Sequence, residues 1–296
     1  MSGADEGLLA HLQTGASEVA RCWRVTRADG VTHGFTDHDV PLAFEGTTFK
    51  ADTGLSAAAL SQTTGLSVDN TEAVGALSDA AITEEDILAG RFDGAVVEAW
   101  LVNWSAPENR ALQFKGSFGE LERQGGAFQV ELRGLAEPTN RPEGRVYQRP
   151  CSAILGDAAC GFDLAVPGYA HDGAVSRIEE DRVLVFDGLD EFSPRWFERG
   201  RLTVLSGAAE GLIGVIKNDR FAGGERRVEL WEELRAEIAA GDRVRLEAGC
   251  DKRLETCRLK FSNLLNFQGF PDIPGDDWVM AYPGRGSTPT GGGSLR

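Results

Sequence analysis

Hydrophobic and polar residues alternate along most of the chain, with the two-residue period of β-strands that are buried on one face. Residues 23–39 contain two such runs on either side of an Asp-Gly dipeptide, which is typical of a hairpin turn. The runs at 95–104 and 112–135 are rich in β-branched and aromatic residues, and a Gly-Gly pair divides the second run into two strands. The pattern predicts a mainly β fold with antiparallel strands.

Few segments favour helices. Residues 3–14 are compatible with a short helix. Thr83 and the three acids after it supply an N-cap and an acidic first turn for a second helix, which Gly90 ends. A C-terminal helix is expected at about residues 252–265.

The second half of the chain repeats the β pattern. Its short strands are joined by hairpin turns at Glu179–Asp181 and at Gly223-Gly224, a spacing typical of a small, nearly closed antiparallel barrel. Proline-rich residues 138–150 indicate a connection between domains. We therefore expect two β-barrel-like domains, divided as a mainly β N-terminal domain (1–145), a cysteine-bearing connector (146–164), a small β-barrel (165–248), a helix and strap (249–283), and a tail (284–296) that is flexible or ordered by a partner.

Composition and charge exclude several classes of partner. The chain has 296 residues and a formal net charge of -16, which argues against binding to a nucleic-acid backbone or to an anionic membrane surface. No window approaches the roughly 18 to 20 apolar residues that a membrane-spanning helix needs. The N-terminus lacks the pattern of a signal peptide, so we expect synthesis in the cytoplasm.

The five cysteines are the strongest chemical signal. Their odd number, without an export signal, disfavours a disulfide framework and favours metal binding or burial. Cys151 and Cys160 precede the predicted barrel, whereas Cys250 and Cys257 follow it. Because the two ends of a compact domain usually emerge close together, the two pairs can converge on one site. Cys22 lies in an alternating run and is expected in the core of a strand.

The spacing leaves three interpretations of these four cysteines. Structural zinc sites usually have two to four residues between paired ligands, whereas eight and six residues lie between these pairs. An iron–sulfur cluster suits the wider spacing, but zinc and plain burial remain open. Because residues seven apart on a helix are separated by about 10.5 Å along its axis, Cys250 is expected in the turn after Gly249. Asp251 would then be the N-cap, and Cys257 would lie on the helix.

Two segments resemble a known family. The stretch CSAILGDAACGFD at 151–163 and the stretch GCDKRLETCRLKFSNLLNFQGFPDIPG at 249–275 are similar to phage tail-tip hub proteins, typified by the lambda tail tip protein L. Blocks of the N-terminal half, including HGFTDHDVPLAFEGTTFKADTG and ITEEDILAGRFDGAVVEAWLVNW, resemble the prophage and gene-transfer-agent branch of that family. The likeness extends up to the tail after Pro283.

This resemblance implies a structural function. It implies a [4Fe-4S] iron–sulfur cluster held by Cys151, Cys160, Cys250 and Cys257. It also implies a homotrimeric hub, with tail-tube-like barrels, between the distal tail protein ring and a central, host-contacting tip or fibre protein. The place of action would be the tail tip of a virion-like particle, after synthesis in the cytoplasm of the host.

Other candidate chemistry is weaker. His33, Asp37, His38 and Asp39 are metal-ligand types at close spacing, but strand alternation places Asp37 and Asp39 on the face opposite His38, so we expect turn capping instead. The nucleophile-elbow, phosphate-loop and zinc-protease motifs are absent, so we expect no enzyme. The competing hypotheses are an iron–sulfur redox protein and a zinc-stapled carbohydrate-binding tail module.

Overall fold

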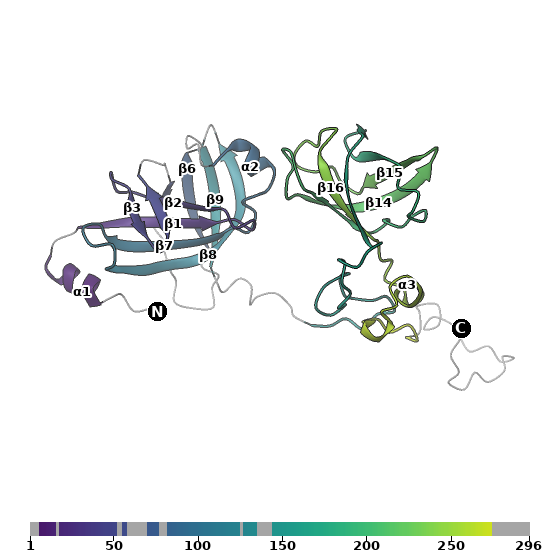
Figure 1. The fold of residues 1–296 in the computed structure, drawn as a ribbon. Coiled ribbons are helices and arrows are strands. Elements are labelled where there is room, and N and C mark those ends of the chain that lie inside the picture. Colours follow the sequence, from purple (N-terminus) through teal and green to yellow (C-terminus); the bar gives the residue numbers. More distant parts are fainter. Residues whose placement is uncertain are drawn as a thin grey trace, which may run out of the picture. The chain divides into compact units, whose positions relative to one another are not determined.

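The computed structural model describes residues 6–15, 18–51, 55–57, 70–76, 82–124, 127–134 and 144–273 (Figure 1). The chain divides into two compact units, residues 1–142 and 143–296, and strands dominate both. The predicted mainly β fold is therefore confirmed. The finer division of the second unit remains a prediction, and the predicted tail lies outside the described residues. Within the described ranges, no helix is long and apolar enough to cross a membrane.

A nine-stranded sheet forms the first unit, in the order β3-β4-β2-β1-β7-β8-β9-β6-β5. Neighbouring strands are antiparallel except for β2 and β4, which run parallel. The strands are β1 (Val19–Thr26), β2 (Thr32–Thr36), β3 (Leu42–Phe44), β4 (Thr47–Lys50), β5 (Leu55–Ala57), β6 (Asn70–Ala76), β7 (Val96–Asn103), β8 (Arg110–Gln124) and β9 (Ala127–Gly134).

Local signals in the first unit act as predicted. The β1–β2 turn contains Gly30 with φ at 86°, a left-handed conformation that glycine adopts without strain. Helix α1 spans Glu6–Gln13, and helix α2 spans Glu84–Leu88. The Thr83 hydroxyl accepts the Asp86 amide hydrogen at 3.2 Å, so the predicted N-cap is confirmed. The predicted Gly-Gly turn between β8 and β9 lies outside the described residues.

The core of the first unit contains Cys22. Its side chain is fully buried in β1, and its thiol donates a hydrogen bond to the Thr36 hydroxyl at 3.5 Å. Burial raises the pKa of this thiol to about 11. Because the thiolate is the reactive form of cysteine, Cys22 is a packing residue, as the alternating pattern predicted.

A seven-stranded sheet forms most of the second unit, in the order β10-β16-β13-β14-β15-β12-β11. The two end members of this order, β10 and β11, follow one another in the chain and are separated only by Val175 and Ser176. The sheet therefore curls into a barrel-like structure (Figure 1). The strands are β10 (Ala170–Ala174), β11 (Arg177–Glu179), β12 (Val183–Asp187), β13 (Arg201–Val204), β14 (Ile213–Ala222), β15 (Glu225–Leu230) and β16 (Arg243–Glu247).

Both predicted hairpin turns of the second unit are present. Glu180 and Asp181 adopt φ of 52° and 55° between β11 and β12. Gly223 and Gly224 adopt φ of 66° and 83° between β14 and β15. Two successive positive φ angles are typical of a type I′ turn, whose twist matches that of the two strands it joins.

A fully buried ion pair lies inside this sheet. The Arg226 guanidinium donates to both Asp219 carboxylate oxygens, at 2.9 and 2.7 Å, and both side chains are 0% exposed. Arg226 also donates to the backbone carbonyls of Leu189, Phe192 and Ser193. The pair therefore connects the β14–β15 hairpin to the loop before β13.

The chain after β16 departs from the predicted helix. Helix α3 covers only Leu254–Leu259, and the 3₁₀ helix η2 covers Leu264–Asn266. Lys252 and Ser262 have positive φ, at 66° and 50°, so the backbone turns sharply before and after α3. The N-cap residue is Arg253, so the prediction of Asp251 at this position was wrong. The Asp251 carboxylate instead accepts the Arg253 amide hydrogen at 3.0 Å, a local turn before the helix.

Candidate metal centre

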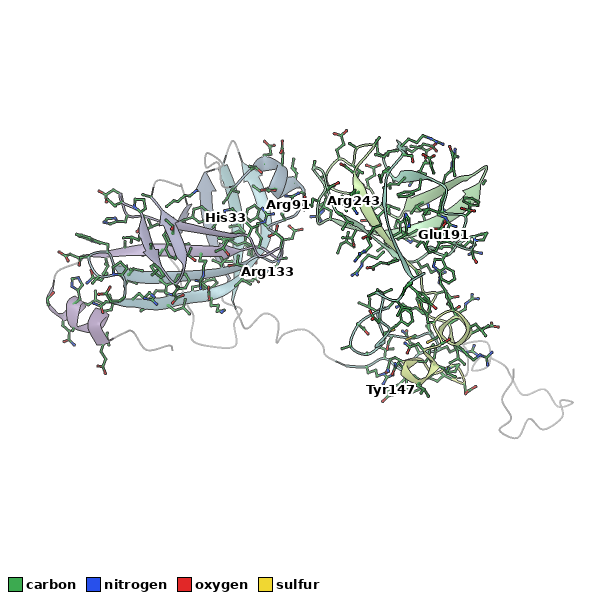
Figure 2. All side chains as sticks on the ribbon, in the orientation of Figure 1. His33, Arg91, Arg133, Tyr147, Glu191 and Arg243 are labelled. Carbon is green, nitrogen blue, oxygen red and sulfur yellow. The ribbon has the colours of Figure 1, made fainter. Side chains whose placement is uncertain are left out.

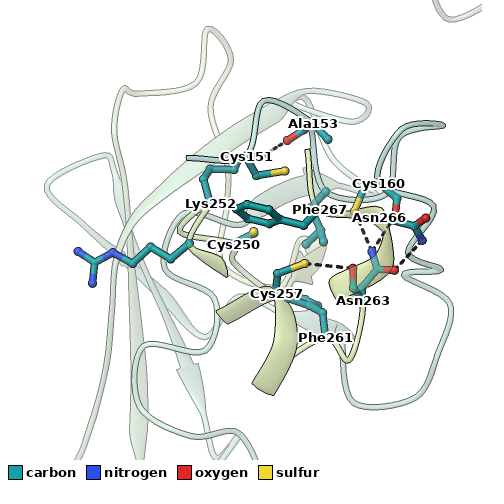
Figure 3. A pocket seen from close by; sticks show the side chains of 12 residues that line it. Cys151, Ala153, Cys160, Cys250, Lys252, Cys257, Phe261, Asn263, Asn266 and Phe267 are labelled. Atoms are coloured by element: carbon teal, nitrogen blue, oxygen red, sulfur yellow. Dashed lines mark hydrogen bonds between the residues drawn. The ribbon is translucent and has the colours of Figure 1, made fainter. Parts of the chain in front are cut away.

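Four cysteines from two separate segments line one pocket of the second unit (Figure 3). Cys151 and Cys160 belong to the connector before the barrel. Cys250 precedes α3, and Cys257 lies on it, as the spacing argument predicted. In the sequence, 89 residues lie between Cys160 and Cys250. The structure therefore brings the four predicted ligands together.

The stem of the barrel explains this convergence. Strands β10 and β16 pair along their length, with Ala170 opposite Glu247. The Ala248 amide then donates to the Tyr169 carbonyl at 2.7 Å. The chain thus enters and leaves the barrel at adjacent positions, and the segments on either side continue together into the cysteine pocket. Figure 2 shows Tyr147, near the start of the connector, in the part of this unit away from the barrel residues Glu191 and Arg243.

Hydrogen bonds hold the connector against the later segment. The Cys151 amide donates to the Lys252 carbonyl at 2.8 Å, and the Lys252 ammonium donates to the Ala153 carbonyl. The Asp157 carboxylate accepts the amide hydrogens of Ile154 at 2.8 Å and of Cys160 at 2.6 Å. These amide hydrogen bonds, that of Cys160 first, lower the pKa of Asp157. The loop that presents Cys160 is therefore closed by an ionised aspartate.

A half-buried cation supports the second pair of cysteines. The Lys260 ammonium donates to the carbonyls of Trp196 at 2.6 Å and of Gly249 at 2.9 Å, and it lies 4.2 Å from the Trp196 ring centre. Burial lowers the pKa of this ammonium to about 8. Gly249 also packs so closely on the Glu198 carbonyl that an added Cβ would lie 1.7 Å from that oxygen. The turn that carries Cys250 is therefore tightly fixed.

The pocket combines apolar walls with donors to sulfur. Phe261 and Phe267 contribute aromatic walls. The Asn263 side-chain amide lies 3.5 Å from the Cys160 sulfur, and the Gln268 backbone amide lies 3.4 Å from the Cys151 sulfur. Such N–H groups stabilise negative charge on sulfur.

Two thiols of the pocket, those of Cys250 and Cys257, resist ionisation. Burial raises the pKa of Cys250, and burial together with the three neighbouring cysteines raises the pKa of Cys257. The influence of Cys250, Cys151 and Cys160 on Cys257 also shows that the four groups interact electrostatically. Cationic metal would supply the charge that four thiolates in a buried site require.

The four cysteines supply a donor set made of sulfur alone. All five cysteines lie in described parts of the chain, and none forms a disulfide. Among the described residues, no group of three or more His, Cys, Asp or Glu side chains is placed to hold a metal ion. Four sulfurs nevertheless line one pocket, with amide donors directed at two of them. Four cysteines are the donor set of iron–sulfur clusters and also of structural zinc sites.

The histidine-rich stretch of the first unit has a structural role, as predicted. The Asp37 carboxylate accepts the Arg21 amide hydrogen at 2.6 Å, and the His38 ring nitrogen Nδ1 lies 3.0 Å from the Val40 amide. His33 packs against the ring of Phe92, at 5.8 Å between ring centres. These contacts cap turns and fill the core.

Sequence reasoning missed the residues that organise the pocket. Asn263 and Gln268 carry no recognisable motif, because their partners lie more than 100 residues away. Asp157 did carry a local signal: an aspartate three residues before Cys160 is suited to accept a backbone hydrogen bond in a turn.

Comparisons with known proteins agree with this structure. A family model described as "Baseplate hub protein, N-terminal attachment domain" matches residues 5–163, which include Cys151 and Cys160. A second model, "Phage conserved hypothetical protein BR0599", matches residues 195–277, which include Cys250 and Cys257. A chain of the solved structure "Virion of native gene transfer agent (GTA) particle" is 55% identical, with 98% of this chain and 100% of that chain covered and a TM-score of 0.90. The comparison with curated proteins gives no match.

Proposed function

Because the chain belongs to the baseplate hub protein family, we propose that it is a structural hub of a phage-like tail tip rather than an enzyme. The observation that carries this proposal is the 55% identity, over nearly the whole of both chains, to a component of a gene transfer agent virion. A mainly β architecture with two compact units is consistent with an assembly component. Its site of action would be the tail tip of a gene transfer agent or siphophage particle.

The proposed partners follow from the resemblance to tail-tip hubs. The chain would form a homotrimer between the distal tail protein ring and the central tip or fibre protein. Counting copies of the chain in purified particles tests this arrangement: three copies per particle support it, and six or one contradict it.

We further propose that Cys151, Cys160, Cys250 and Cys257 hold a [4Fe-4S] cluster. The supporting observation is that four unpaired thiols, two on each side of the barrel, line one pocket with amide donors at two sulfurs. When bound, the cluster would supply iron–thiolate bonds that cross-link the connector to the segment around α3.

The proposed role of the cluster is mechanical. A cross-link between Cys160 and Cys250 closes a loop of 89 intervening residues, and closing a loop of this size removes considerable entropy from the unfolded chain. Metal binding is then coupled to folding, so that the apoprotein is less stable than the loaded protein. The cluster would hold the stem of the barrel in one geometry for its partners.

Metal analysis of protein purified without oxygen tests the cluster. We expect iron and acid-labile sulfide in equal amounts, near four of each per chain for a [4Fe-4S] cluster. Cys257→Ser should abolish iron loading and lower the melting temperature of the second unit, whereas Cys22→Ser should leave the iron content unchanged. Stoichiometric zinc without sulfide, or equal iron in the two variants, contradicts the assignment.

A further inference from the structure

Asn263 contacts two of the four pocket cysteines. Its side-chain nitrogen Nδ2 donates to the Cys160 carbonyl at 2.7 Å and lies 3.5 Å from the Cys160 sulfur (Figure 3). Its backbone carbonyl accepts from the Cys257 thiol at 3.3 Å, and its amide donates to the Cys257 carbonyl at 3.0 Å. Asn263 therefore bridges a cysteine before the barrel and a cysteine after it.

The orientation of the Asn263 amide is fixed by its partners. A backbone carbonyl can only accept, so the group that faces the Cys160 carbonyl at 2.7 Å must be the NH₂. The opposite atom, Oδ1, lies 2.7 Å from the Asn266 side-chain nitrogen. The Cys160 carbonyl alone is therefore enough to place the NH₂ group next to the Cys160 sulfur.

Metal binding changes the two sulfur contacts of Asn263 in opposite ways. A ligated Cys257 has lost its proton and can no longer donate to the Asn263 carbonyl. The Nδ2–H near Cys160, in contrast, gains strength when that sulfur becomes an anionic thiolate, because hydrogen bonds to charged acceptors are stronger. In the described residues, Asn263 is the one side chain that donates to a sulfur of the four cysteines.

We propose that Asn263 is a positioning residue that holds the Cys160 sulfur and raises the reduction potential of the cluster. This inference rests on the proposed function of the four cysteines. An N–H directed at a ligating sulfur stabilises the more negative, reduced state, and hydrogen bonds to sulfur are among the factors that set cluster potentials. Removal of the donor should therefore make reduction harder.

The experiment compares the full-length wild-type protein with N263A, the nearly isosteric N263L, and the control N266A. Asn266 lies in the same network but donates to Asn263 and not to sulfur. Each protein is purified without oxygen, its iron and sulfide are counted, and its midpoint potential is measured by one-electron titration with dithionite. The Fe–S(Cys) stretching frequencies are recorded by resonance Raman spectroscopy.

We expect a lower midpoint potential and a shifted Fe–S stretching frequency in N263A and N263L, with N266A like the wild type. Failure of both Asn263 variants to bind iron, while N266A binds it fully, also supports the positioning role. Loaded Asn263 variants with the potential and frequencies of the wild type overturn this inference but leave the cluster assignment intact. A wild-type protein without iron and sulfide overturns the proposed cluster and this inference with it.

Discussion

The buried Asp219–Arg226 pair offers a direct test of what holds the second unit together. Arg226→Met removes the guanidinium but keeps a long apolar side chain in its place. The Asp219 carboxylate then stays fully buried, and among the described residues it keeps the Phe197 amide hydrogen, at 2.9 Å, as its hydrogen-bond donor. Three loop carbonyls lose a donor at the same time.

The expected cost follows from the lost partner. Removal of one member of a buried ion pair typically costs about 3 to 5 kcal/mol. Arg245→Met is the matched control, because Arg245 pairs with Asp172 on the surface, where both side chains are substantially exposed. That pair should contribute only about 0.2 to 1 kcal/mol. The double variant Asp219→Asn with Arg226→Met removes the unpaired charge as well. It should therefore recover part of the lost free energy of unfolding.

Hydrogen-exchange mass spectrometry measures the loss of stability in the second unit separately from the first. Because a factor of ten in an equilibrium corresponds to about 1.4 kcal/mol, amides of β14 and β15 should exchange about a hundred to several thousand times faster in Arg226→Met. Amides of β1 and β7, in the other unit, serve as the internal reference and should not change. Equal exchange in Arg226→Met and Arg245→Met would refute the reasoning.

Two further predictions concern the pocket. Gly249→Ala should greatly reduce the iron content and destabilise the second unit, because the added Cβ would lie 1.7 Å from the Glu198 carbonyl oxygen. Gly144→Ala is the control: an added Cβ there meets nothing within 4 Å, so iron content and stability should not change. Competitive labelling with acetic anhydride should show Lys260 titrating near pH 8, because burial disfavours its charged form. Since the folded pKa is lowered from an unfolded value near 10.4, this group alone should make the folded state more stable as pH rises from about 8 to about 10. A labelling midpoint near 10.4 would contradict the partial burial of this lysine.

Much of the fold could be predicted because its signals are local. The turns at Gly30, at Glu180-Asp181 and at Gly223-Gly224 depend on the residues in the turn itself, and all three are present where the sequence predicted them. The Thr83 cap depends on an amide three residues away. Alternation along a strand likewise needs no knowledge of the strand's partner.

Features that depend on distant partners could not be predicted. Asp219 and Arg226 lie in strands among other charged residues and look like surface positions, yet both are fully buried because each satisfies the other. The length of α3 is set by the turns at Lys252 and Ser262, where non-glycine residues adopt positive φ under tertiary constraint. The spacing of the four cysteines located the pocket, but it gave no sign of Asn263 or Gln268.

The paired stem makes the barrel an insertion with a single point of attachment. Since β10 and β16 are adjacent, and the Ala248 amide donates to the Tyr169 carbonyl, residues 170–247 leave the cysteine-bearing segment and return to it at the same place. The insertion also supports that segment, because the Trp196 carbonyl accepts from Lys260 and from the Gly249 amide. A different domain with neighbouring ends could therefore replace residues 170–247 and keep the pocket only if it supplied an equivalent backbone carbonyl.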